Sequence, residues 1–147
     1  MGRKGARWGM TGQRIIRPDT AFSISPVKGR KRPRVHDHAH LAFIRTLKCC
    51  ICGKPGPDPA HIRSANALYG KPQAGMGEKA SDKWTVPLCR EHHDEQHKAG
   101  NELLWWASKR IDPFGLALAL HHSSGDDEVA EGILQSHINK QGQSNGT

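Results

Sequence analysis

Apolar side chains are spaced for a short helix in residues 35–48. They recur at helical intervals, at Leu41, Phe43, Ile44 and Leu47. This pattern predicts an amphipathic helix packed on a core, with Asp37 as its N-cap. Three histidines occur along the same segment, and a helix would spread them around its surface. We therefore expect surface positions rather than metal ligands for His36, His38 and His40.

The following segment predicts a strand, a long loop, a second strand and a helix. A short apolar stretch in residues 58–63 ends at His61. Residues 64–81 are rich in Gly, Lys, Ser and Ala, as is typical of a loop. The apolar run that leads to Cys89 predicts the second strand, and the polar residues 90–98 follow a three-and-four spacing that predicts a helix. These elements form a small α+β unit.

Two more helices are predicted downstream. Asn101 is the expected cap of a helix that ends before Asp112-Pro113, and another begins at Phe114. Neither end of the chain has a sustained period. We predict a disordered basic arm, a domain with flanking helices and a disordered polar tail, over residues 1–34, 35–122 and 123–147.

Composition favours a metal-stabilised domain with a polyanionic partner. Only 35% of the residues are apolar and 5% aromatic, and a small core of this kind usually needs a staple such as a metal. Residues 1–48 hold twelve Lys and Arg against two acidic residues, which favours nucleic acid over a merely solvated arm. Without a signal peptide or a long apolar run, we expect a soluble cytoplasmic protein with reduced thiols and no membrane partner.

Two paired sets of ligand residues predict a structural zinc site. Cys49 and Cys52 form C-x2-C, and Gly53 then suits the tight turn of a zinc knuckle. Cys89 and His92 form C-x2-H after 36 intervening residues. Cys50 would point away from this site. The alternative is that these cysteines are buried thiols without a metal.

Three more histidines are candidates for a second, open metal site. His93 and His97 are four residues apart, so a helix places them on one face, where they can hold a divalent ion. His61 comes from a different element, and its neutral imidazole could accept a proton from an attacking water. For each one separately, the alternative is an ordinary surface histidine.

The combined pattern C-x2-C…AHI…D…VPLC-x2-HH-x3-H resembles the HNH endonucleases, which have a ββα-metal fold. It is most similar to the phage and prophage group that includes the recombination-enhancement nuclease Ref. The resemblance spans Cys49 to His97, and its specific parts are the run from Gly75 to Asp82 and the run VPLCREHHDEQH. A phage or prophage protein would act in the cytoplasm of a bacterial host.

The resemblance implies a role for each of these residues. Zinc would be held by Cys49, Cys52, Cys89 and His92, and the catalytic ion by His93 and His97. His61 would be the general base. Asp82 would take the middle position, commonly Asn, and aim the base through hydrogen bonds. Ala60 stands where many members place another metal ligand, so the ion would rely on water and phosphate or recruit Asp58.

These patterns predict a metal-dependent DNA endonuclease that hydrolyses phosphodiester bonds, with Zn2+ as structural ion and Mg2+ or Mn2+ as catalytic ion. We expect no small-molecule ligand. Phosphate contacts are expected from Arg63 and Lys79, for which loop solubility is the alternative, and from a basic cluster of Lys28, Arg30, Lys31, Arg32 and Arg34. The alternative function is a non-catalytic, zinc-stabilised module that binds nucleic acid, and a third is a small scaffold in phage assembly.

Overall fold

The computed structural model describes residues 33–75 and 77–142. Of the predicted basic arm, residues 33 and 34 fall within this range. The predictions for residues 1–32 lie outside the described residues, and these include Lys28, Arg30, Lys31 and Arg32. Within the described part, the chain is an α+β domain of five helices around one two-stranded sheet. None of those helices is both long and apolar enough to span a membrane.

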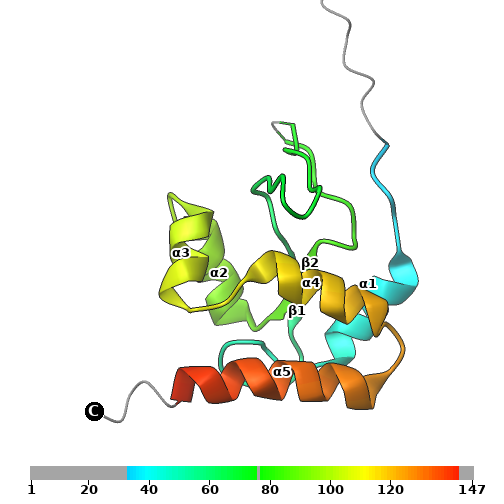
Figure 1. Ribbon diagram of the computed structural model, residues 1–147, viewed down its shortest axis with the longest axis vertical. Helices are drawn as coiled ribbons and strands as arrows, with labels where there is room; N and C mark the ends of the chain where they lie inside the picture. The colour runs from blue at the N-terminus through cyan, green and yellow to red at the C-terminus, as the bar shows by residue number, and fades with distance from the viewer. Residues whose placement is uncertain (1–32, 76, 143–147) are drawn as a thin grey trace, which may run out of the picture. The chain divides into compact units, whose positions relative to one another are not determined.

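The sheet is antiparallel and lies between the helices (Figure 1). Strand β1, Asp58–His61, pairs with β2, Thr85–Leu88, in a register that sets Asp58 opposite Leu88 and His61 opposite Thr85. Pro59 and Pro87 face each other, which costs no ladder bond because their backbone groups point outward. The Pro87 carbonyl accepts instead from the Cys50 N–H at 3.0 Å. This bond joins the cysteine segment to the outer edge of β2.

Helix α1, His38–Thr46, begins where the pattern predicted. Its N-cap is Asp37, whose carboxylate accepts from the His40 N–H at 2.9 Å. One expectation for this segment is wrong: the His40 side chain is fully buried, with Nδ1 3.0 Å from Ser124 Oγ. The ring also packs edge-on against His121, so tertiary contacts hold this histidine inside.

The other predicted helices are present, and Asn101 caps one of them as predicted. Helix α2, Arg90–Lys98, follows β2 directly after Cys89. Helix α3, Glu102–Ser108, is capped by Asn101, and α4, Pro113–His122, is capped by Asp112. Together with α1 and the sheet, these helices enclose a hydrophobic core. Its largest buried side chains include Ile44, Ile62, Trp84, Leu88, Trp106 and Leu116.

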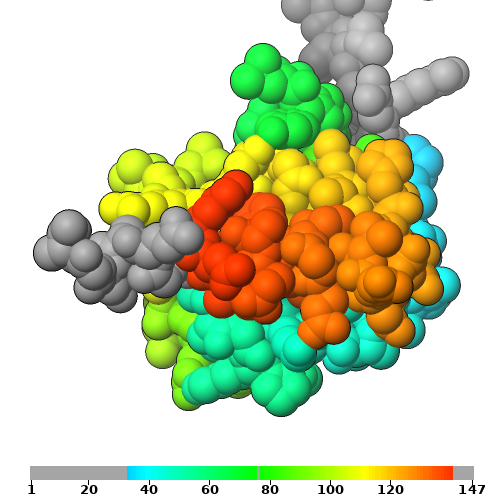
Figure 2. Space-filling view, turned by 60° about the horizontal axis from the view of Figure 1, so that its bottom comes forward, coloured from blue at the N-terminus to red at the C-terminus, as the bar shows by residue number. Residues whose placement is uncertain are grey.

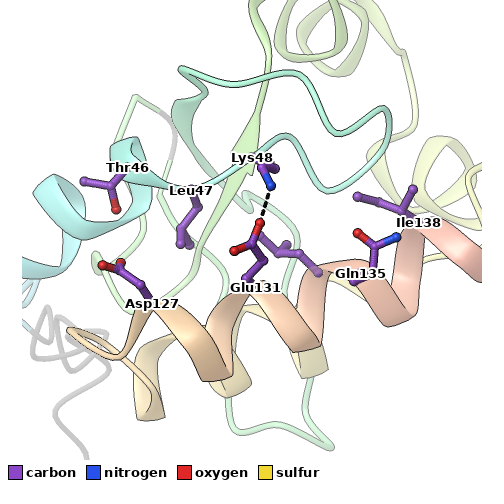
Figure 3. A pocket seen from close by; sticks show the side chains of 8 residues that line it. Thr46, Leu47, Lys48, Asp127, Glu131, Gln135 and Ile138 are labelled. Carbon is purple, nitrogen blue, oxygen red and sulfur yellow. Dashed lines mark hydrogen bonds and ion pairs between the residues drawn. The ribbon is translucent and has the colours of Figure 1, made fainter.

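The predicted disordered tail is wrong for most of its length. Asp127–Gly142 forms helix α5, the longest helix of the described chain, which packs beside α4 (Figures 1 and 2). Ala130 and Leu134 of α5 are buried in the core. Figure 3 shows Lys48 paired with Glu131 across a cavity of about 250 Å³ between α5 and the end of α1. Because α5 closes this side of the core, it belongs to the domain.

Candidate functional site

The predicted zinc ligands come together in the fold. The ligand atoms of Cys49, Cys52, Cys89 and His92 all lie within 4.8 Å of one another. His92 Nδ1 is 3.1 Å from Cys89 Sγ and 3.5 Å from Cys49 Sγ, and the sulfurs of Cys52 and Cys89 are 3.7 Å apart. Around zinc, tetrahedral ligand atoms would be separated by about 3.5 to 3.8 Å. Two of the three distances lie in this range and the third is shorter, so the four residues, which we call the zinc frame, could hold a structural zinc ion.

The chemistry of the zinc frame also favours a bound cation. Burial, together with the neighbouring Cys49 and Cys89, raises the pKa of Cys52 to about 11. Several thiolates this close together repel each other unless a cation compensates their charge. Burial lowers the pKa of His92, which keeps its imidazole neutral and able to bind a metal. Cys50 is fully buried and takes no part in the cluster, as predicted.

A tight knuckle positions the first two ligands. Gly53 has a φ of 72°, a left-handed conformation that side chains disfavour. Its N–H donates to the Cys49 carbonyl at 2.9 Å, and the Cys49 N–H donates to the Lys54 carbonyl at 2.8 Å. A side chain at Gly53 would meet the Ile138 methyl group of α5 at 3.6 Å. Helix α5 therefore covers the knuckle directly.

The candidate general base is held by a buried carboxylate. His61 Nε2 is 2.8 Å from Asp82 Oδ1, and Arg34 Nη2 donates to the same oxygen at 2.6 Å. The Asp37 N–H donates to Asp82 Oδ2 at 2.9 Å. We call these four residues the Asp82 network. The Asp82 side chain is completely buried, so all of its visible partners are protein donors.

Electrostatics within the Asp82 network suit a base that works near neutral pH. Burial alone would raise the pKa of Asp82, but hydrogen bonds from Arg34, His61 and the Asp37 N–H hold it well below its usual value. Burial lowers the pKa of His61; Asp82 opposes this effect, while the charges of Arg34 and Lys79 reinforce it. His61 is thus neutral and able to accept a proton.

The second pair of histidines faces a common point. On α2, His93 Nε2 and His97 Nε2 are 3.1 Å apart. Two imidazoles on one divalent ion would place their nitrogens about 3.0 to 3.4 Å apart. The other ring nitrogen of His93, Nδ1, is 3.4 Å from Asp58 Oδ2. A carboxylate in this position fixes the tautomer of a metal-binding histidine, so Asp58 fits a supporting role better than a ligand role.

The two predicted phosphate contacts outside the arm are exposed near these histidines. The charge of Arg63 lowers the pKa of His97, after burial and His93, and Lys79 acts similarly on His61. The Arg63 backbone is anchored by the buried Glu102, whose carboxylate accepts its N–H at 3.0 Å. This anchoring shows how the loop after β1 is held, which the sequence alone did not indicate.

Arg34 is the one residue of the predicted basic cluster that the structure describes. Arg34 was grouped with its basic neighbours, but its guanidinium lies inside the Asp82 network with 28% of the side chain exposed. Charge counting cannot separate a residue with a buried partner from one that faces solvent. The expected phosphate contact of Arg34 stays a prediction beside this internal role.

Comparison with known proteins identifies a family. The chain belongs to the family described as Protein of unknown function (DUF968), which it matches over residues 17–106. It is similar to Uncharacterized protein YdfU of Escherichia coli strain K12, with 42% identity over 82 residues. These residues are 56% of this chain and 22% of YdfU, so the match spans less than a quarter of that relative. No solved structure matches the chain.

Proposed function

We propose that this protein is a metal-dependent endonuclease of the HNH type, which hydrolyses phosphodiester bonds of DNA. The proposal includes a ββα-metal unit made of β1, β2 and α2. The zinc frame holds the unit together. His61 serves as the general base, and His93 and His97 hold a catalytic Mg2+ or Mn2+.

One observation carries this proposal. His61, whose imidazole is oriented by the Asp82 carboxylate, is the last residue of β1. Asp58, the first residue of the same strand, supports the paired imidazoles of His93 and His97 on α2. A zinc module that only binds nucleic acid needs neither arrangement. Metal-assisted hydrolysis requires at least a general base and a metal site with free coordination positions.

The side chains divide the reaction between them. Asp82 accepts a hydrogen bond from His61 Nε2, which leaves Nδ1 with the lone pair that takes a proton from the attacking water. A divalent ion at His93 and His97 would supply charge stabilisation for the phosphate and the leaving oxygen. Exposed Arg63 and Lys79 hold the DNA backbone through its phosphates.

A non-catalytic module that binds nucleic acid is the second candidate. It is favoured by Ala60, which is fully buried in β1 and offers no ligand where HNH enzymes commonly have one. In the described part of the chain, the zinc frame is also the only cluster of three or more metal-binding side chains. The catalytic ion would therefore depend on two imidazoles, water and the DNA itself.

Plasmid cleavage with Mg2+ or Mn2+ separates the two candidates. With equal zinc content, His61→Ala should reduce the cleavage rate by about 10²- to 10⁴-fold, the usual contribution of a general base. His122→Ala, which changes an exposed histidine of α4, is the matched control and should cut like the wild type. Binding of DNA without cleavage by wild type under any divalent ion would establish the module instead.

A further inference from the structure

The segment that carries Arg34 is tied into the candidate site by the backbone of its following residues, and Arg34 itself by its side chain. The Val35 N–H donates to Ser81 Oγ at 3.2 Å, and the Asp82 N–H donates to the Val35 carbonyl at 3.1 Å. With the bond from the Asp37 N–H to Asp82, these contacts clamp the segment just before α1 onto the segment just before β2. The Arg34 side chain is thereby directed at Asp82 from a fixed backbone.

The hydrogen-bond inventory explains why this position is Asp rather than Asn. Three donors converge on the carboxylate: Arg34 Nη2, the Asp37 N–H and His61 Nε2. A carboxylate only accepts, so both of its oxygens are satisfied. An amide in its place would turn an N–H2 group toward a donor. The Asp82 carboxylate and the Arg34 guanidinium therefore depend on each other, because the charge of each offsets the free-energy cost of burying the other.

The same inventory sets the orientation of the imidazole. Nε2 of His61 lies 2.8 Å from Asp82 Oδ1 but 3.4 Å from Arg34 Nη2. Arg34 carries only donors, so the closer carboxylate must be the partner of Nε2, which then bears the proton. His61 Nε2 and Arg34 Nη2 lie close together because both donate to the same oxygen, Asp82 Oδ1.

We propose that Arg34 is a positioning residue of the candidate nuclease site: together with Asp82 it holds the His61 ring with Nε2–H on the carboxylate and Nδ1 free as the base. The inference rests on the proposed function, because the base needs a reaction to serve. Arg34 has a second effect, on the charge balance. Asp82 alone would favour the imidazolium form of His61, and the positive charge of Arg34 opposes that and keeps the pKa low.

The first test is spectroscopic and needs no cleavage. In the zinc-loaded full-length protein, long-range 1H–15N correlation spectra of the imidazoles report tautomer and pKa, with the His61 signals assigned from their absence in His61→Gln. Wild type should show Nε2–H. Arg34→Gln should show a mixed tautomer and a His61 pKa higher than in wild type. Arg34→Lys keeps one positive charge and should stay close to the wild-type His61 pKa. If Arg34→Gln does not fold, a clearly raised His61 pKa in Arg34→Lys would overturn the inference.

The second test is the pH dependence of single-turnover cleavage. Arg34→Gln should lower the rate by about 10- to 100-fold near pH 6.5, as loss of a supporting residue commonly does. The difference in cleavage rate between the variant and wild type should become smaller toward pH 9, where His61 is neutral in both proteins. An unchanged tautomer and an unchanged His61 pKa in folded Arg34→Gln would overturn the inference. That result, with weaker DNA binding, would assign Arg34 to phosphate contact alone. Absence of cleavage in wild type would instead refute the nuclease proposal, while the spectra would still decide the role of Arg34.

Discussion

Helix α2 contributes to two candidate metal sites that the protein surrounds to very different extents. On the zinc frame, Cys89 and His92 meet two further candidate ligands from the knuckle, so the protein supplies four ligand atoms. One residue further along, His93 and His97 form the open candidate site, to which the described part of the chain adds no third ligand within the same reach. A closed ligand set is typical of structural zinc, and free positions are typical of catalytic ions.

The surroundings differ in the same sense. Helix α5 covers the knuckle, and Cys49 and Cys89 are buried, so the zinc frame adjoins the core on one side, while Cys52 is exposed. His97 is exposed, and the side chain near it, Arg63, is exposed as well. One helix can therefore contribute to a closed and an open candidate site, because adjacent residues of a helix point in different directions.

The largest expected effect is the loss of a zinc ligand. Cys52→Ala should abolish zinc binding and unfold the domain, since structural zinc contributes about 10 to 16 kcal/mol in zinc-finger peptides. Cys50→Ala is the control and should keep one zinc per chain and lose only about 1 kcal/mol. Zinc content and thermal denaturation measure both variants. The comparison is sharp because Cys52 is exposed and Cys50 is buried, so burial without metal would predict the reverse order.

The next effect concerns the support that α5 gives the zinc frame. Leu134→Ala should reduce the free energy of unfolding by about 2 to 5 kcal/mol, the usual cost of a large-to-small change in a core. Val129→Ala, on the exposed side of the same helix, should change it by less than about 0.5 kcal/mol. Denaturant titration provides the measurement. Equal stability of the two variants would mean that α5 is not part of the domain.

A smaller effect is expected at the open site. In the zinc-loaded protein, His97→Ala should weaken Mn2+ binding by about 100-fold and Asp58→Asn by about 10-fold, because a supporting carboxylate contributes less than a ligand. Calorimetry would measure the affinity, and His122→Ala is the control. Zinc content should be unchanged in all three variants. An Mn2+ affinity of His97→Ala equal to that of the control would contradict the open site.

The smallest effect is a pH dependence of stability through Asp82. Its pKa is lowered in the fold, so its contribution is fully present well above the usual carboxyl pKa of about 4 and is lost progressively as the pH falls through that value toward the lowered pKa. Wild type should exceed Asp82→Asn by about 1 to 3 kcal/mol at pH 7, and by less at pH 4. Thermal denaturation of both proteins with equal zinc content tests this. A stability difference between wild type and Asp82→Asn that increases as the pH falls would refute a lowered pKa of Asp82.

Local signals predicted a large part of the fold. The caps at Asp37 and Asn101 lie where the pattern placed them, because capping needs only a side chain and the next turn of backbone. Helix α5 was missed for the opposite reason. Its apolar positions, Ala130, Leu134 and Ile138, recur at helical intervals within a largely polar segment, and Ala130 and Leu134 become buried only when α5 packs on the rest of the domain, beside α4. Burial of His40 likewise depends on Ser124 and His121, far along the chain.

The sequence by itself determined the ligand sets, since their spacing is local: two residues between paired zinc ligands, and four positions between histidines on one helical face. The resemblance had already linked Asp82 to His61, but only the tertiary structure added Arg34 to this pair. Arg34, His61 and Asp82 come from three separate segments, and no periodicity links them. They meet because the segment before α1 is hydrogen-bonded to the segment before β2, and because a buried carboxylate must find its donors wherever the fold brings them.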